Sequence, residues 1–377
     1  MQTVSEIKKV LRLDIEKLRD PRGFLNAGIP RFNRFFGRDS LISGWQLLDT
    51  DPLICRATLE ALSKLQSRRF NKKTDEEPGK IIHETYSGPR SKPPHRYFPM
   101  PYYGAIDSTP LYLIVFAMYL DRTKDRAFVK KHRFHIAAAA EWVTKRIEKD
   151  GFLYYQRGNR KGLFHQGWKD GFGNHLQIRL PVAIVEAQGY AYLALSAAAK
   201  LLPRSSFNFL HTARELKARF TQSFWMQKPR YFALALDGKR KQRAAITSNP
   251  GHLLFTGILN RDQADAVVRR LFKPDIFTSY GIRTHSAKEP DFDSLSYHLG
   301  SVWPHDNWII AQGLKKLGHK QEYLKIKKAL LRAYQKIGFI PEFYGVIDNK
   351  IILEMEKMVC HPQAWANGAL LNFLSQK

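Results

Sequence analysis

The stretch VSEIKKVLRLDIEKLR, residues 4–19, carries the pattern from which the architecture of this chain is inferred. Its apolar residues recur every three or four positions, at Ile7, Val10, Leu11, Ile15 and Leu18. This spacing puts them on one face of a helix, so the stretch predicts an amphipathic α-helix. Further helices are predicted over residues 39–48, 52–65, 108–122, 128–148, 181–201, 207–225, 250–259, 261–272, 303–317, 321–337 and 362–374.

These twelve predicted helices lie mostly in pairs joined by short loops. One strand is predicted over residues 231–236, before a turn at Asp237-Gly238. Strands and helices do not alternate, so a parallel sheet is not expected. Four long segments interrupt the helices, at residues 67–107, 150–180, 274–302 and 338–361, and loops this long are typical of functional sites.

We therefore predict an all-α fold, an (α/α)6 toroid of about twelve helices with long functional loops and at most a small β-hairpin. The whole chain, residues 1–377, is expected to form one domain. An irregular α-solenoid is the alternative, but the sequence has no fixed repeat period to support it.

Composition indicates a globular protein in a reducing compartment. Hydrophobic residues make up 44% of the 377, enough to bury a large core. Cys55 and Cys360 are far apart and belong to no CxxC pair, so neither a disulfide nor a zinc cluster is indicated. Residues 1–6 lack the apolar core of a signal peptide, and the longest apolar run, residues 111–120, is too short to span a bilayer. We expect a soluble cytoplasmic protein with no membrane association.

The net charge of +27 raises the question of a polyanionic partner. The basic residues are, however, dispersed along the chain, and runs such as residues 239–241 are short. No helix-turn-helix, RNP-like or Cys/His finger pattern accompanies them. A lysine-rich solvated surface is the interpretation we favour over nucleic-acid binding, and the sequence leaves the oligomeric state open.

Two candidate carboxylates point to glycoside chemistry. Asp170 ends the motif QGWKD, residues 166–170, where Trp168 can stack on a sugar ring. Glu342 follows a proline in an aromatic setting, 172 residues later. Cleavage of a glycosidic bond requires a general acid together with a base or nucleophile, and two carboxyl groups commonly fill these roles. A carboxylate beside a tryptophan also arises by chance on surfaces, so this pair alone does not decide the function.

Other motifs have both structural and ligand-binding interpretations. Arg38-Asp39 begins a predicted helix, where Asp39 suits the helix dipole, and the same pair can hydrogen-bond vicinal sugar hydroxyls. Asp107 is a helix cap or a ligand contact. His83-Glu84 lacks the second histidine of a zinc HExxH motif, and no nucleotide or flavin motif is present. We therefore expect no metal and no cofactor.

A set of motifs in family order resembles the amylo-α-1,6-glucosidase (glycogen-debranching) family of the glucoamylase-like six-hairpin superfamily. They cover nearly the whole chain: AGIP and FGRDS within residues 27–40, DEEPGKIIHE (75–84), YGAIDSTPL (103–111), QGWKD (166–170), VEAQGY (185–190), TSNPGH (247–252), SVWPHDN (301–307) and PQAW (362–365). Three positions depart from the family pattern: Arg31 stands where an aromatic is common, Gly171 replaces a serine, and Phe343 replaces a leucine. The N-terminal β-rich domain common in the family is not expected here.

The resemblance implies an inverting hydrolase that releases glucose from an α-glucoside, most simply an α-1,6-linked oligosaccharide, glycogen or limit dextrin. By that similarity Asp170 is the general acid and Glu342 the general base, and inversion requires roughly 6.5–9.5 Å between the two carboxyl groups. The implied substrate-binding residues are Arg38, Asp39, Glu84, Asp107, Trp168, Lys169, Glu186, Gln188, Trp303, His305 and Trp365. The alternatives are a sugar isomerase or phosphorylase on the same toroid, or a non-catalytic glycan-binding module.

Overall fold

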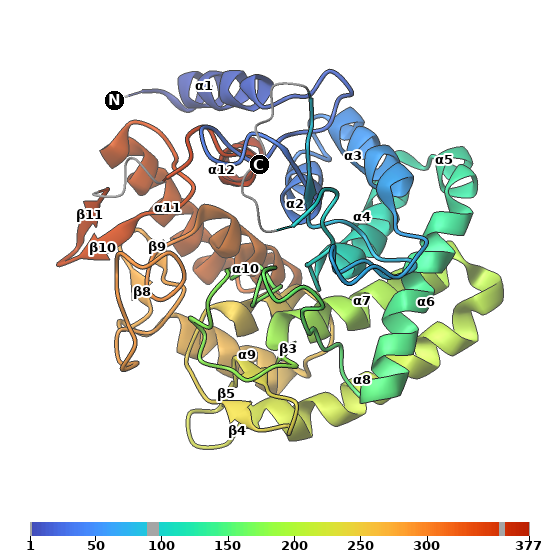
Figure 1. Cartoon of the computed structure of the whole chain (residues 1–377). Coiled ribbons are helices and arrows are strands. Elements are labelled where there is room, and N and C mark those ends of the chain that lie inside the picture. The colour runs from blue at the N-terminus through green and yellow to red at the C-terminus, as the bar shows by residue number, and fades with distance from the viewer. Residues whose placement is uncertain (1, 89–97, 354–358, 377) are drawn as a thin grey trace.

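The computed structural model describes residues 2–88, 98–353 and 359–376. Helices dominate it (Figure 1). Their bounds are α1 Val4–Lys17, α2 Gly37–Gln46, α3 Pro52–Leu65, α4 Ser108–Thr123, α5 Arg126–Lys131, α6 Arg133–Asp150, α7 Val185–Leu201, η1 Pro203–Ser205, α8 Ser206–Phe224, η2 Asn249–Phe255, α9 Arg261–Leu271, α10 Pro304–Leu317, α11 Lys320–Ile337 and α12 Ala364–Ser375.

Six of these helices form a closed inner ring. In chain order, α2, α4, α7, η2, α10 and α12 each pack against the next, and α12 closes the ring against α2. A second layer lies outside, where α1, α3, α6, α8, α9 and α11 each pack against a member of the ring. Figure 1 shows the closure, with α1 and α12 from the two ends of the chain side by side. The predicted (α/α)6 toroid is confirmed.

The sequence of each helix matches its layer. Eleven of the sixteen residues of α4 are buried, and they lie on all sides of the helix, as expected for an inner-ring helix. The outer helix α11 instead buries one stripe, made of Ile326, Ala329, Leu330, Ala333 and Tyr334, and keeps four of its five lysines exposed. Burial of these apolar faces is the main force that holds the two layers together.

Two predicted helices differ from the observed ones. The helix expected over residues 128–148 is divided into α5 and α6, because the chain turns at His132, whose ring packs against Phe128 at 4.6 Å. The helix expected over residues 250–259 is the short 3-10 helix η2. Gly257, with φ of +84°, follows η2 and prevents a longer helix.

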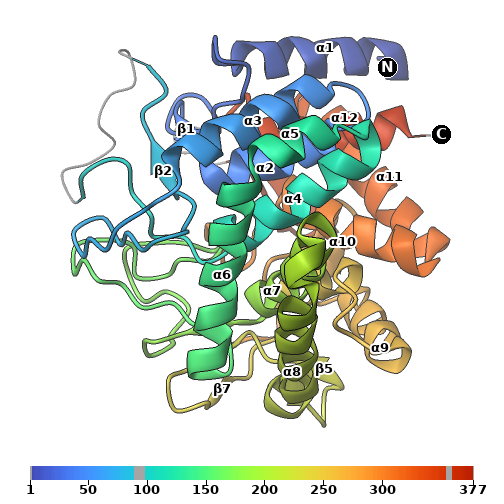
Figure 2. The same cartoon turned by 90° about the vertical axis from the view of Figure 1, so that its right-hand side faces the viewer.

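Short antiparallel strands fasten the loops to the ring. The predicted strand 231–236 is two strands, β5 (Tyr231–Phe232) and β6 (Ala235–Leu236). The remaining pairs are β1 (Phe35–Phe36) with β2 (Glu84–Thr85), β3 (Ala183–Ile184) with β6 and β6 with β7 (Gln242–Arg243), β4 (Trp225–Met226) with β5, β8 (Phe277–Thr278) with β9 (Gly281–Ile282), and β10 (Gly345–Ile347) with β11 (Lys350–Ile352). Figure 2 shows the blue and green connecting segments gathered on one side of the helices. Within the described ranges, no helix combines the length and apolarity that a bilayer crossing would need.

The inner ring places the predicted motifs together. Arg38-Asp39, Asp107, Glu186, His305 and Trp365 lie at or near the N-terminal ends of α2, α4, α7, α10 and α12, respectively. Residues that are far apart along the chain therefore meet at one end of the toroid. The partial positive charge of helix N-termini makes this end favourable for carboxylates.

Candidate active site

One pocket lies where the inner helices begin. Its walls are formed by Phe32, Phe36, Arg38, Asp39, Trp168, Asp170, Tyr297, Trp303, Glu342 and Trp365. Wider grooves occur elsewhere on the surface, but among the described residues this pocket is the one that combines both predicted catalytic carboxylates with a cluster of tryptophans. It brings together seven residues that the sequence predicted for the site.

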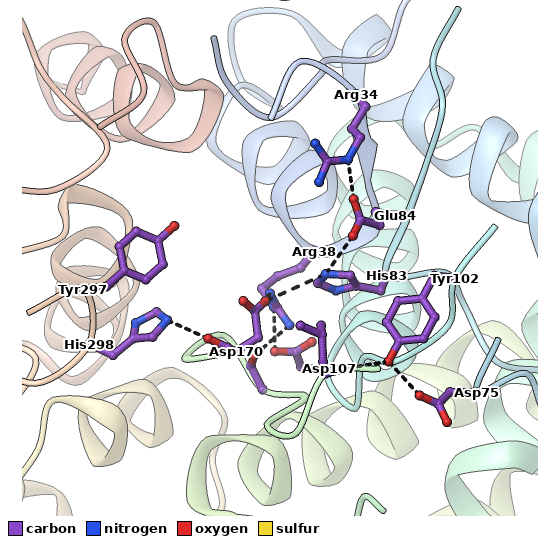
Figure 3. A network of polar contacts seen from close by, with 12 residues as sticks. Arg34, Arg38, Asp75, His83, Glu84, Tyr102, Asp107, Asp170, Tyr297 and His298 are labelled. Carbon is purple, nitrogen blue, oxygen red and sulfur yellow. Dashed lines mark hydrogen bonds and ion pairs between the residues drawn. The ribbon is translucent and has the colours of Figure 1, made fainter. Parts of the chain in front are cut away.

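Arg38 holds Asp170 in position (Figure 3). Its Nη1 donates to Asp170 Oδ2 at 2.9 Å, its Nε donates to Asp107 at 2.7 Å, and its Nη2 donates to the carbonyl of Gly167 at 2.9 Å. Asp107 thus lies behind the guanidinium, which is buried. The Asp170 side chain remains 26% exposed, so it can still reach a ligand.

Burial and the neighbouring charge have opposite effects on Asp170. Desolvation raises its pKa above the ordinary value, and the Arg38 guanidinium opposes that rise. The ring nitrogen Nε2 of His83 lies 4.0 Å from Asp170 Oδ2 (Figure 3). A raised pKa keeps a larger fraction of the carboxyl protonated near neutral pH, which is what a general acid requires.

Glu342 has a different environment, on the segment between α11 and β10. The Tyr297 hydroxyl donates to its Oε1 at 2.6 Å, and the backbone N–H of Cys360 donates to its Oε2 at 3.2 Å. Desolvation raises the pKa of Glu342 to about 7, while these hydrogen bonds favour the ionised form. The carboxyl group is therefore buried and oriented, and it titrates near neutral pH.

Asp39 is a third acid in the pocket, in the first turn of α2. Desolvation raises its pKa to about 8, and adjacent Arg38 acts in the opposite direction. Asp39 is 6% exposed, and the charges of Asp170 and Glu342 raise its pKa further. A partly protonated carboxyl of this kind can both donate to and accept from sugar hydroxyls.

Aromatic rings form the remaining walls. Trp168 and Trp303 meet at 5.8 Å with their planes at 73°, and Trp303 contacts Trp365 at 6.0 Å. His305 stacks on Trp365 at 3.6 Å, nearly parallel, and burial lowers the pKa of His305 well below its ordinary value. Within the described part of the chain, the indole Nε1 atoms of Trp168 and Trp365 are buried and lack hydrogen-bond partners.

Several predicted binding residues support the pocket without lining it. Glu84 forms a buried ion pair with Arg34. Gln188 bonds the backbone N–H and carbonyl of Leu153. Lys169 is buried and donates its Nζ to the carbonyl of Thr284 at 2.6 Å. Asp107, Glu186 and His305 are likewise absent from the pocket wall. The part that any of these side chains takes in substrate binding stays a prediction.

Three pocket residues were not singled out from the sequence. Phe36 begins the FGRDS motif and Phe32 lies between AGIP and FGRDS, but an isolated phenylalanine carries no signal of a ligand role. Tyr297 lies in the long segment before Trp303, in SLSYHLGSVW (residues 294–303). An aromatic residue so close in sequence to the SVWPHDN motif is the one signal that could have marked Tyr297 as a candidate site residue. Its partner Glu342 lies 45 residues further along the chain, and a local sequence pattern does not show such a long-range hydrogen bond.

A group that could hold a metal lies in the loop before α10. Ligand atoms of His285, Glu289 and Asp291 lie within 4.8 Å of one another. Protein donors already engage them: Arg243 Nη2 donates to Asp291 at 2.7 Å, and the N–H of Ile246 donates to Glu289 at 2.9 Å. This arrangement explains the cluster as part of the loop structure, and we assign it no ion.

Glu186 lies in the first turn of α7 and provides a test of the buried electrostatics. It is fully buried, and the neighbouring Asn249 side chain only partly offsets the cost of ionising it there. Burial raises its pKa above the ordinary value of 4.5, so the folded protein retains a proton that the unfolded chain releases. Its contribution to stability is therefore largest at low pH and falls as the pH rises above about 4.5.

We expect Glu186→Gln to reduce the loss of thermal stability between pH 5 and pH 8. If the burial of this charge costs about 1 kcal/mol at pH 8, the fall in Tm across that range should shrink by roughly 1–2 °C. Thermal denaturation of the wild type and the variant at several pH values measures this. Glu141→Gln, at a 61% exposed side chain, is the control. An unchanged slope in Glu186→Gln would show that this carboxyl does not titrate differently in the folded state.

Comparisons with known proteins agree with this geometry. The profile of the mannosylglycerate hydrolase MGH1-like glycoside hydrolase domain matches residues 133–345. Mannosylglycerate hydrolase MGH1 of Selaginella moellendorffii is 32% identical over 91 residues, which is 24% of this chain and 18% of that protein. A mannosylglycerate hydrolase of Rubrobacter radiotolerans is 26% identical over 94 residues, 24% of this chain and 21% of that protein. The chain thus aligns with only about a fifth of the length of these relatives.

Solved structures extend the agreement in fold to the whole chain. The GH63 mannosylglycerate hydrolase from Thermus thermophilus, in complex with Tris and D-glycerate, superposes with a TM-score of 0.75 at 13% sequence identity. The superposition covers 98% of this chain and 99% of that one. The complex of the same enzyme with glucose gives a TM-score of 0.75, also at 13% identity, over 98% and 100% of the two chains. At this identity the likeness concerns the fold alone.

The family match refines the resemblance seen in the sequence. The six-hairpin glycosidase fold is confirmed, but the matching profile is mannosylglycerate hydrolase-like, and the narrower amylo-α-1,6-glucosidase assignment is not confirmed. Because the profile covers more than half of the chain, it decides the family. The chain belongs to the family of mannosylglycerate hydrolase MGH1-like glycoside hydrolase domains.

Proposed function

We propose that this protein is an inverting glycoside hydrolase that releases a hexose from a small α-glycoside with an acidic leaving group, such as glycerate. The observation that carries the proposal is one pocket in which two carboxyls, Asp170 and Glu342, have different partners. Family membership supports hydrolysis of a glycoside, and the names of the relatives supply glycerate as the first leaving group to test.

The proposed reaction is a single displacement. Asp170 gives its proton to the glycosidic oxygen as the bond to the anomeric carbon breaks. Glu342 takes a proton from a water molecule, whose oxygen attacks the anomeric carbon from the opposite face. The products are the hexose with inverted anomeric configuration and the free hydroxyl of the leaving group. Arg38 keeps Asp170 in place, and Tyr297 keeps Glu342 in place.

The tryptophan walls and Asp39 would bind the sugar. Stacking on Trp168 or Trp303 covers the apolar face of a pyranose, and Asp39 offers a partner for its hydroxyls. The α-1,6-linked oligosaccharide or limit dextrin implied by the debranching-family motifs is the second substrate class. Residues of these motifs, within 27–40 and 301–307, contribute to the pocket, and for this reason the α-1,6-linked substrates are included in the test.

Hexose release from a substrate panel tests the proposal. The panel contains α-mannosylglycerate, α-glucosylglycerate, isomaltose, maltose and limit dextrin, each with and without phosphate. We expect phosphate-independent hydrolysis that is fastest for the glycerate glycosides. Release of a sugar phosphate would instead indicate a phosphorylase, and binding without turnover of any substrate would indicate a glycan-binding module.

The hydrogen bond from Tyr297 predicts a shift in the pH dependence. This bond stabilises the ionised form of Glu342, so Tyr297→Phe should raise the pKa of Glu342 further. The base must be ionised to act, and the acidic limb of the kcat/KM profile should therefore move to higher pH by about 1 unit, with about a tenfold loss at pH 6. Tyr344→Phe is the matched control, since the Tyr344 hydroxyl donates to the carbonyl of Tyr280. An unmoved limb in Tyr297→Phe would contradict the assignment of Glu342 as base.

A further inference from the structure

A tight turn places Arg31 at the rim of the pocket. Gly28 and Phe32 exchange backbone hydrogen bonds of 3.1 and 2.9 Å, which leaves residues 29–31 as the tip of the turn. Pro30 and Arg31 are exposed at this tip, while Phe32 is half-buried and contributes its side chain to the pocket wall. Arg31 therefore stands between the solvent and the residue that lines the site.

The turn is fixed to the segment that orients the base. The N–H of Ile29 donates to the carbonyl of Pro362 at 3.0 Å, and the N–H of His361 donates to the carbonyl of Ile29 at 2.8 Å. Gly28 permits this approach, because a Cβ atom there would come within 2.9 Å of the Cβ of Cys360. The neighbouring N–H of Cys360 is the one that binds Glu342. Arg31 is thus carried by a well-defined backbone and not by a loose loop.

Two guanidinium groups lie against the phenylalanine wall of the pocket. The Cζ of Arg31 lies 5.0 Å from the ring centre of Phe32, and that of Arg34 lies 5.6 Å from the same ring and 4.7 Å from that of Phe36. Arg34 is buried and its charge is balanced by Glu84. Arg31 also has an interaction within the protein, and it differs from Arg34 in exposure alone: its side chain lies at the surface beside Phe32, where an incoming ligand would meet it.

The charge of Arg31 reaches the catalytic centre. Arg31 is among the groups that lower the pKa of Glu342 by Coulombic attraction, although desolvation dominates. An aromatic side chain at this position would extend the apolar wall, whereas arginine adds a planar fork of donors suited to a carboxylate or a phosphate.

We propose that Arg31 is a specificity-determining residue that binds the anionic group, carboxylate or phosphate, of the leaving group. This inference rests on the proposed glycosidase function and deepens it. The sugar occupies the tryptophan-lined pocket, the scissile oxygen lies at Asp170, and the leaving group extends outward along the Phe32–Phe36 wall to the guanidinium of Arg31. A purely structural role for Arg31, as a cation on the Phe32 ring, would affect charged and neutral substrates equally.

The test compares three α-mannosides whose leaving groups carry a carboxylate, a phosphate or no charge: the glycerate, the glycerol phosphate and the neutral glycerol glycoside. Arg31→Gln should lower kcat/KM by about 10–100-fold for the preferred anionic substrate and by less than about 2-fold for the neutral one. Arg31→Lys keeps the positive charge but lacks the planar fork of donors. Its loss of kcat/KM on the anionic substrate should therefore be smaller than that of Arg31→Gln but still measurable. The larger loss, on glycerate or on glycerol phosphate, identifies the anion. Arg12→Gln, at an exposed arginine on α1, controls for the general change in charge.

Two results would overturn the inference: an equal loss on charged and neutral substrates, or no loss on any of them. Failure of the proposed function is distinguishable, because the wild type would then hydrolyse none of the three. In that case binding of D-glycerate and of glycerol phosphate, measured by NMR in the wild type and in Arg31→Gln, still decides the matter. Equal binding of both anions by the two proteins, or none by either, would refute a role for Arg31 in anion recognition.

Discussion

Replacement of Asp170 with asparagine is expected to lower kcat on a glycerate glycoside by about 10²–10⁴-fold, with little change in substrate affinity. An amide cannot supply the proton that the leaving oxygen requires, yet it keeps the size of the carboxyl and can still accept a hydrogen bond from Arg38. Steady-state kinetics, together with binding measured by calorimetry, separate the two effects. Asp49→Asn, at a surface carboxylate paired with Arg122, is the matched control.

The leaving group provides a sharper form of the same test. Fluoride departs from an α-glycosyl fluoride with little need of a proton, so Asp170→Asn should retain far more of its activity on the fluoride than on the glycerate glycoside. A similar loss on both substrates would mean that Asp170 acts in some way other than as the acid. Full activity on the glycerate glycoside would remove Asp170 from the mechanism altogether.

Replacement of Glu342 with glutamine should have an effect of similar size but a different pattern. Without a base the water is not activated, so kcat should fall by about 10²–10⁴-fold on the glycerate glycoside and on the fluoride alike. Azide needs no deprotonation, and we expect it to restore reaction with the fluoride by forming the inverted glycosyl azide. Glu141→Gln is the control at an exposed carboxylate.

The two variants together separate the roles of the carboxyls. Rescue by a good leaving group in Asp170→Asn, but not in Glu342→Gln, would assign acid and base to these two residues. If the pattern were reversed, with the fluoride rescuing Glu342→Gln, the two roles would have to be exchanged. Loss of folding is excluded by comparing the Tm of each variant with that of the wild type.

The fold was predictable because its signals are local. Apolar residues at helical spacing identify the outer helices, and broader apolar stretches such as residues 108–122 identify the inner ones. The break at His132 and the short helix η2 were not predicted, since each depends on tertiary packing or on one glycine. The number of domains and the cellular location remain predictions.

The candidate site was predictable where chemistry and motif coincide. The structure brings Asp170, Glu342 and three tryptophans to one pocket, as their motifs indicated, although their catalytic and binding roles are still proposals. Gln188 and Glu84 instead bond to protein groups, and a sequence cannot tell which partner a polar side chain will find. Tyr297 was missed for the same reason, because its significance depends on a long-range contact with Glu342.

The central claim, direct displacement by water between two carboxyls, is tested most directly by the configuration of the first-formed sugar. Proton NMR during the first minutes of hydrolysis of an α-linked glycerate glycoside distinguishes the anomers before they equilibrate. We expect the β-hexose to appear first and the α-anomer to follow by mutarotation. Initial release of the α-hexose would mean retention through a covalent intermediate and would contradict the roles proposed for Asp170 and Glu342.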